Sequence, residues 1–124
     1  MYEITKILKF EAAHYLPEYC GKCREPHGHN FKVEVTLQSP TLCERGHSSG
    51  MIVDFTILKQ KVEPILEEID HKFLNDIIEY PTAEHVAKWI FDRIKAALLE
   101  YDASLRLKQI VVWENDESRA LYME

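Results

Sequence analysis

The segment FKVEVTLQ, residues 31–38, alternates apolar and polar side chains without a break. On an extended chain, the apolar residues fall on one face: Phe31, Val33, Val35 and Leu37. This period of two predicts a β-strand with one face in a core and the other at the surface. A chain with such a strand needs a second layer of structure to cover the apolar face.

Three further segments predict strands. Residues 2–12 alternate imperfectly, whereas residues 106–115 (RLKQIVVWEN) and 119–124 (RALYME) flank a polar turn around Asn115–Ser118. Turn-forming residues between two such runs are typical of a hairpin. Together with residues 31–38, these segments predict four strands.

Two helices are predicted between the second and third strands. Asp54 and Thr82 are their expected N-caps, because the side-chain oxygen of such residues accepts from free backbone N–H groups. Pro64 lies inside the first helical pattern and predicts a kink or a break there. The order strand, strand, helix, helix, strand, strand predicts an α+β fold, with an antiparallel sheet and both helices on one face. The apolar residues of the two patterns recur at helical spacing: Phe55, Leu58, Val62, Ile65, Leu66 and Ile69, then Val86, Ile90, Ile94, Ala97, Leu98 and Tyr101.

The composition is that of one compact domain. The chain has 124 residues, 46% of them hydrophobic, and shows no repeat or linker, so we expect residues 1–124 to form a single domain. With a net charge of −6 and no Lys/Arg cluster, nucleic-acid binding through a basic surface is not expected. The apolar runs, such as QIVVW, are too short to cross a bilayer, and MYEITKILKF has no signal-peptide core. We therefore expect a cytoplasmic protein without a membrane partner.

Three histidines are predicted to converge on a metal ion. His27 and His29 are separated by one residue, so they project from the same face of an extended chain. They share this parity with the core-facing residues of 31–38, which places both imidazoles at the start of a buried face. His14 ends the first predicted strand and would lie beside them in a hairpin. Three histidines with one open position are typical of a catalytic zinc site.

A closed structural zinc site is the alternative. Cys20 and Cys23 form a C-x2-C motif before His27 and His29, and the four residues together would fill a tetrahedral site. The H-x-H spacing is unlike that of common Cys2His2 sites, however, and the closed site leaves His14 unexplained.

The adjacent pair Asp70 and His71 predicts a proton relay. A carboxylate can orient an imidazole and raise its basicity near neutral pH. Cys23 is the natural partner, because a nearby metal ion and a protonated histidine would stabilise its thiolate. Cys20 and Cys43 lack such partners in sequence, and we expect them to be spare reduced thiols.

Glu114 ends the run IVVWE and shares parity with Ile110 and Val112. A carboxylate on a buried strand face needs hydrogen-bond donors. A ligand with two parallel N–H groups, such as an aminopyrimidinone edge, would satisfy it bidentately. A glutamate turned to solvent at the end of a strand is the equally weighted alternative.

Six short motifs occur along the chain in the order seen in a known family: FEAAHYL, C-x3-HGHN-F, GMIVDF, DHKFLND, PTAEH and VVWE. They are similar to those of the 6-pyruvoyl-tetrahydropterin synthase / 6-carboxytetrahydropterin synthase family, over essentially the whole chain. The three residues between Cys23 and His27 look most like the queuosine-pathway branch. The resemblance implies the tunnelling (T-) fold, a four-stranded antiparallel sheet with two helices on one side. It also implies a trimeric barrel that stacks into a homo-hexamer, with active sites between subunits.

The resemblance further implies roles for individual residues. His14, His27 and His29 match the zinc ligands, and Cys23, Asp70 and His71 match the catalytic triad. Glu114 matches the pterin-binding glutamate, and Thr82, in PT-x-E, matches a residue near the pterin ring.

The implied enzyme is a zinc-dependent carbon–carbon lyase. It would convert 7,8-dihydroneopterin triphosphate to 6-carboxy-5,6,7,8-tetrahydropterin, acetaldehyde and triphosphate. Triphosphate elimination by a pyruvoyltetrahydropterin synthase, side-chain cleavage by a folate-type aldolase, and a non-catalytic zinc-stabilised binding module stay open. Glu25 bears on the aldolase, since some relatives use a glutamate in this region in place of the cysteine. Lys22, Arg24 and Lys32 are candidates for binding the triphosphate.

Overall fold

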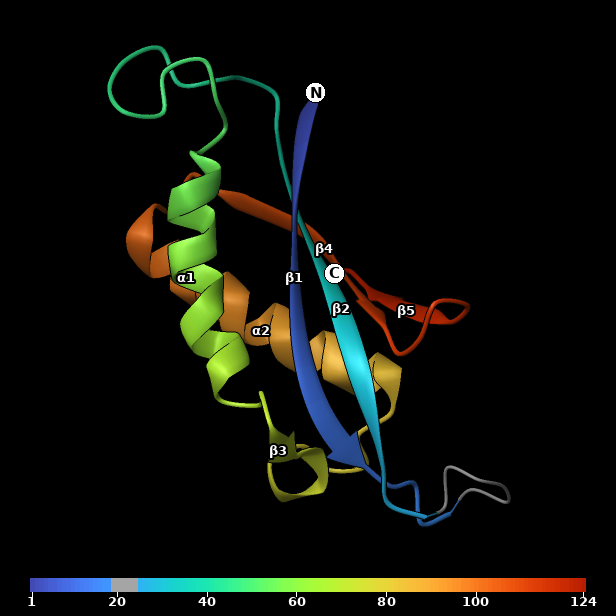
Figure 1. Cartoon of the computed structure of the whole chain (residues 1–124). Helices are drawn as coiled ribbons and strands as arrows, with labels where there is room; N and C mark the ends of the chain where they lie inside the picture. Colours follow the sequence, from blue (N-terminus) through green and yellow to red (C-terminus); the bar gives the residue numbers. More distant parts are fainter. Residues whose placement is uncertain (19–24) are drawn as a thin grey trace.

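The computed structural model describes residues 1–18 and 25–124 as a sheet packed against two helices (Figure 1). In chain order the elements are β1 (Tyr2–His14), β2 (His27–Ser39), α1 (Phe55–Glu67), β3 (Lys72–Phe73), a short 3-10 helix η2 (Leu74–Asp76), α2 (Ala83–Tyr101), β4 (Arg106–Trp113) and β5 (Arg119–Tyr122). The predicted α+β class and the order of the main strands and helices are confirmed. None of the helices in these described ranges has the length and apolarity that crossing a membrane requires.

The sheet corrects the prediction of four antiparallel strands. It has five strands in the order β3-β1-β2-β4-β5, and β3 pairs with β1 in parallel, so the sheet is mixed. β3 is two residues long, which is too short to show the alternation that predicts a strand. β1 and β2 also extend further than predicted, to His14 and from His27, so all three histidines lie within the hairpin.

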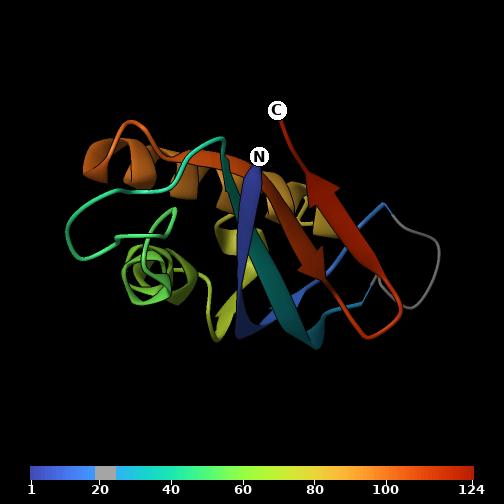
Figure 2. The same cartoon turned by 90° about the horizontal axis from the view of Figure 1, so that it is seen from above.

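The core lies between one face of the sheet and both helices. Along β2 the odd-numbered residues face the helices, and Val33, Val35 and Leu37 are fully buried. Leu58 of α1 and Ile90 of α2 pack against this face in the same cluster. Figure 2 shows the layers from above, with the helices beside the strands and β5 at the far edge of the sheet. Residues 31–38 therefore alternate for the predicted reason, because one face of the strand is buried in the core.

Both predicted helix caps are present. The Asp54 side chain accepts a hydrogen bond from the N–H of Thr56 at 2.7 Å, and Thr82 accepts one from the N–H of His85 at 3.2 Å. Of the kink or break predicted at Pro64, the break is wrong, because α1 continues through this residue to Glu67. Pro64 lies in the last turns of the helix, where the missing N–H removes only one of the final backbone hydrogen bonds.

The β1–β2 register positions the candidate site. The two strands pair from Tyr2↔Ser39 to His14↔His27 without interruption. The hairpin thus brings the end of β1 directly opposite the start of β2, below the helices in Figure 1.

Candidate metal centre and adjacent pocket

Three histidines meet at the end of the β1–β2 ladder. His14 pairs with His27 across the strands, and His29 pairs with Ala12, which shares the core-facing side with His14. The three ring centroids lie 4.5, 4.6 and 5.0 Å apart. His14 is fully buried and the other two are half-buried. The structure therefore brings together the two histidines that strand parity predicts and the third that hairpin pairing predicts.

Backbone carbonyls determine which ring nitrogens carry hydrogen. Nδ1–H of His14 donates to the carbonyl of Pro81 at 2.7 Å, and Nδ1–H of His27 donates to the carbonyl of Glu25 at 2.8 Å. A carbonyl can only accept, so in the neutral rings Nε2 bears the lone pair. A metal-binding histidine usually donates its other ring N–H to such a carbonyl, which fixes the orientation of the ring.

The inward-facing nitrogens lack hydrogen-bond partners. Among the described residues, Nε2 of His14, His27 and His29 is buried in each case and makes no hydrogen bond. Buried polar atoms are rarely left unsatisfied, since desolvation without a partner is unfavourable. Three converging lone pairs would be satisfied by one cation, so the residues fit a metal ion.

Glu114 is the fourth member of this cluster. It follows β4 directly, and its Oε1 lies 3.2 Å from Nε2 of His29, at ion-pair distance but without hydrogen-bond geometry. One ligand atom from each of the four side chains lies within 4.8 Å of the others. Glu114 is half-buried and turned to the histidines, so the solvent-facing alternative is wrong. Sequence reasoning missed its nearness to the metal site, although the parity with Ile110 and Val112 was the signal.

The electrostatics favour neutral histidine. Burial lowers the pKa of His29, while the nearby Glu114 carboxylate opposes that shift and His14 and His27 reinforce it. A metal binds the neutral imidazole, so a lowered pKa suits the role of ligand. Imidazole nitrogens with one carboxylate oxygen are a donor set that zinc and other first-row transition metals accept.

The cysteines of the C-x2-C motif lie outside the described residues. Cys20 and Cys23, together with Lys22 and Arg24, lie in residues 19–24, which the structure does not describe. The cysteine half of the closed-site alternative therefore lies outside the described residues. That alternative omits His14, however, whose ring lies 4.5 Å from that of His27 and 5.0 Å from that of His29.

Asp70 and His71 lie beside β1, linked to Glu11. His71 Nδ1 is 3.0 Å from Asp70 Oδ1, and its Nε2 is 3.2 Å from Glu11 Oε2. The backbone N–H of Glu11 donates to Asp70 Oδ1 at 3.0 Å, which is the first cause that lowers the pKa of Asp70. His71 has φ 58°, a left-handed conformation that non-glycine residues seldom adopt. Sequence reasoning missed Glu11, because nothing in FEAAH separates it from an ordinary exposed strand residue.

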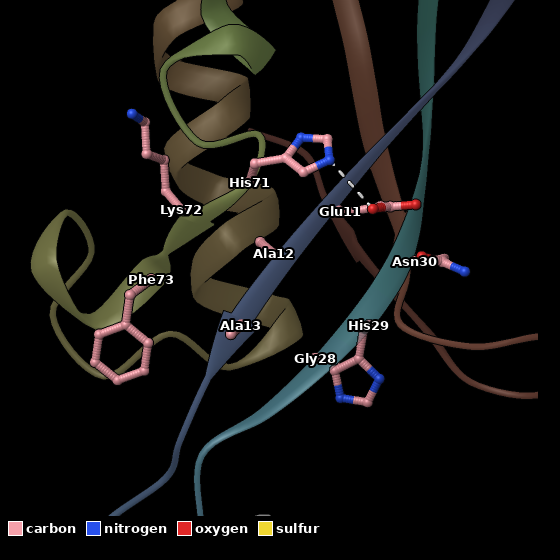
Figure 3. A pocket seen from close by; sticks show the side chains of 9 residues that line it. All are labelled: Glu11, Ala12, Ala13, Gly28, His29, Asn30, His71, Lys72 and Phe73. Carbon is pink, nitrogen blue, oxygen red and sulfur yellow. Dashed lines mark ion pairs between the residues drawn. The ribbon is translucent and has the colours of Figure 1, made fainter.

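A pocket of about 520 Å³ joins the two groups (Figure 3). His29 and His71 both line it, and Figure 3 shows Glu11 and His71 pointing toward one another across β1. The pocket thus has a candidate metal ligand and a candidate proton-transfer residue on its walls. Its lining consists of Glu11, Ala12, Ala13, Gly28, His29, Asn30, His71, Lys72 and Phe73.

Thr82 has a structural role in this chain. Its hydroxyl caps α2, while the neighbouring Pro81 carbonyl holds His14. His85 is engaged with the carbonyl of Tyr80, and His47 lies 3.0 Å from Asp54 in a distant loop. Neither of these two histidines belongs to the metal cluster.

Comparisons with known proteins agree with this arrangement. A family model described as 6-pyruvoyl tetrahydropterin synthase matches residues 3–124. The chain belongs to the 6-pyruvoyl tetrahydropterin synthase family.

Relatives within the family carry more than one activity in their names. A Synechocystis protein named 6-carboxy-5,6,7,8-tetrahydropterin synthase is 43% identical over 100 residues, covering 78% of each chain. A Pyrococcus furiosus protein named dihydroneopterin monophosphate aldolase is 34% identical, covering 87% of this chain and 85% of its own. The Caenorhabditis elegans 6-pyruvoyl tetrahydropterin synthase structure superposes with a TM-score of 0.83 at 26% identity, covering 99% of this chain and 95% of that one.

Proposed function

We propose that the protein is a zinc-dependent 6-carboxy-5,6,7,8-tetrahydropterin synthase acting on 7,8-dihydroneopterin triphosphate. Family membership and the name of the Synechocystis relative support the pterin chemistry. The observation that carries the metal dependence is the set of three buried Nε2 atoms without partners. The product would enter queuosine (7-deazaguanine) biosynthesis in the cytoplasm.

His14, His27 and His29 would hold the zinc ion. When bound, zinc supplies a Lewis acid that lowers the pKa of coordinated hydroxyl oxygens. The carbonyls of Pro81 and Glu25 orient His14 and His27 and keep these two rings in the tautomer that binds metal.

Glu114 would bind the pterin ring. Its carboxylate can accept two parallel N–H donors, and its place beside His29 puts the ring close to the histidine cluster. A contact of this kind orients the substrate and takes no part in making or breaking bonds. Loss of Glu114 should therefore first impair how the substrate is held in the site. We propose Thr82 as a second contact near the ring, supported by the position of its segment against His14.

Cys23, Asp70 and His71 would move the protons. As a thiolate, Cys23 removes a proton from the substrate side chain. His71, held at Nδ1 by Asp70, exchanges protons with the substrate oxygens. Asp70 is suited to this because its lowered pKa keeps it ionised near neutral pH.

We further propose that the chain assembles into a homo-hexamer of two trimers. On its outer side β1 pairs with β3 only at Ala12 and Ala13, so among the described residues the stretch 2–11 has no strand partner there. β5 forms the opposite edge of the sheet. Open edges of this kind can pair between copies. Light scattering coupled to size-exclusion chromatography gives the mass, and a monomer would contradict this assembly.

A side-chain aldolase is the second candidate, supported by the Pyrococcus furiosus relative. Glu25 is exposed just before His27, and its carbonyl supports that histidine. If its carboxylate takes part, Glu25→Ala changes the products or the rate. Unchanged products and rate make it a bystander.

Mass spectrometry of the products tests the function. The zinc-loaded chain is incubated with 7,8-dihydroneopterin triphosphate, and we expect 6-carboxytetrahydropterin with acetaldehyde and triphosphate. A pyruvoyl product or a hydroxymethylpterin would assign one of the two other pterin reactions. No turnover by the metal-loaded protein would support a non-catalytic zinc-stabilised module.

A further inference from the structure

Glu11 makes three contacts with the dipeptide Asp70–His71. Its N–H donates to the Asp70 carboxylate, and its carbonyl accepts from the N–H of His71. Its own carboxylate lies 3.2 Å from His71 Nε2, while its neighbour Ala12 pairs with Lys72 at the start of the parallel ladder. One residue of β1 thus fixes both the backbone and the ring of the proposed proton-transfer group.

These contacts explain how His71 keeps its unusual backbone. A left-handed conformation is unfavourable for a residue with a Cβ unless the surroundings impose it. The hydrogen bond from His71 N–H to Glu11 and the pairing of Lys72 with Ala12 restrain the chain on both sides of that conformation. The turn directs the imidazole across β1 toward the pocket (Figure 3).

The imidazole then lies between two carboxylates. Asp70 faces Nδ1 at 3.0 Å and Glu11 faces Nε2 at 3.2 Å. Among the described residues, these two are the acidic side chains within ion-pair distance of His71, and Lys72 is the basic side chain that shares the pocket wall. Both nitrogens donate at once only in the doubly protonated ring.

We propose that Glu11 is a positioning residue that, with Asp70, holds the His71 imidazole between two carboxylates so that the ring faces the pocket. This inference rests on the proposed function, because it gives Glu11 its role through proton transfer by His71. The ring must face the substrate each time it exchanges a proton with it. The Glu11 carboxylate restrains the orientation of the ring in addition to Asp70.

The contact is well suited to a clean test. The side chains of His71 and Glu11 are 71% and 61% exposed, and an ion pair this exposed contributes little to folding stability. Glu11→Gln keeps the size of the side chain and removes its charge, while every backbone contact remains. Glu3→Gln is the matched control, because Glu3 lies on the same exposed face of the same strand, paired with Lys108 instead.

Kinetics with 7,8-dihydroneopterin triphosphate give the first readout. We expect Glu11→Gln to lower kcat roughly tenfold with KM nearly unchanged, less than the loss of a full general acid–base group because Asp70 still holds Nδ1. Glu3→Gln should match the wild type. A wild-type enzyme without turnover refutes the proposed function, whereas an active wild type with an equally active Glu11→Gln variant refutes only the role of Glu11.

Nitrogen-15 NMR of the His71 ring gives a readout that does not depend on turnover. In Glu11→Gln we expect the Nε2 resonance to move, while the same signal in Glu3→Gln stays at its wild-type position. A purely structural role of Glu11 would lower kcat only together with the melting temperature and would leave the Nε2 signal of the folded protein unchanged. That outcome overturns the proposal.

Discussion

Removing the imidazole of His14 tests the metal centre most directly. His14 is fully buried, its Nε2 faces the other two histidines, and its Nδ1–H satisfies the buried carbonyl of Pro81. His14→Ala therefore removes one proposed ligand and leaves one buried acceptor without its donor. The two effects are separable, because only the first depends on zinc.

The size of each effect follows from these contacts. Free zinc at 100 times its Kd stabilises the native protein by about 2.7 kcal/mol. For a chain of 124 residues, about 4 °C of Tm per kcal/mol makes this a rise of about 11 °C. Loss of a residue that only supports a metal ligand weakens binding by up to about 100-fold. If the loss of a ligand weakens zinc binding by this factor of about 100, the same zinc concentration stabilises the variant by only about 0.4 kcal/mol, or less than about 2 °C of Tm. The unsatisfied Pro81 carbonyl costs about 1–3 kcal/mol and lowers the metal-free Tm by about 4–12 °C.

Thermal melts with and without zinc measure both quantities. Protein stripped with a chelator is melted in metal-free buffer and again at a fixed free zinc concentration, with the wild type, His14→Ala and His47→Ala side by side. His47 is an exposed histidine outside the cluster, so its variant should keep the full rise with zinc. An undiminished rise in His14→Ala would refute the three-histidine site. Loss of the rise in Cys23→Ser, with His14→Ala unaffected, would instead establish the closed Cys2His2 site.

Three further predictions test the remaining groups. Cys23→Ala should retain zinc, measured by metal analysis, but lose activity, whereas His27→Ala should lose both; loss of zinc in the cysteine variant would contradict this. The hydrogen bond from the N–H of Glu11 is the first cause that lowers the pKa of Asp70 below its ordinary value of 3.8 in the folded protein. The ionised side chain therefore stabilises the fold above the ordinary pKa, and this stabilisation disappears as pH falls through the lower pKa of the folded state. The Tm difference between wild type and Asp70→Asn should therefore shrink as pH falls from about 6 to about 3, and a constant difference in circular-dichroism melts would contradict it. Thr82→Ala should cost about 1 kcal/mol, or about 4 °C of Tm, through loss of the α2 cap. A rise in KM beyond that stability effect would support its proposed contact with the pterin, and an unchanged KM would exclude it.

The parts of the fold that sequence predicted were those with a regular local period. Residues 31–38 alternate because one face of β2 is buried, and the same parity extended back to His29 and His27. The caps Asp54 and Thr82 were predictable because each needs only its own side chain and the next turn of backbone. The convergence of His14 with the other histidines followed from hairpin pairing of neighbouring strands.

The parts that sequence missed depend on contacts between distant residues. β3 is held by pairing with β1, and two residues leave no pattern that marks them as a strand. Glu11 contacts His71 only because that ladder brings residues 59 and 60 positions apart together, which no local period encodes. The break at Pro64 is wrong for the opposite reason: a local rule predicts it, whereas the helix continues through the proline to Glu67.

The pairing of β1 with β2 runs without interruption from Tyr2↔Ser39 to His14↔His27. The three histidines therefore meet only when the two strands pair in this register. Sliding β1 past β2 by one residue would set His14 against a neighbour on the opposite side of the sheet and move its imidazole away from the other two. Only the correctly aligned hairpin can then close around the ion. A metal ion that binds only the correctly paired hairpin would stabilise that hairpin relative to misaligned ones during folding. The ion would then favour the correct strand register before it takes part in any reaction.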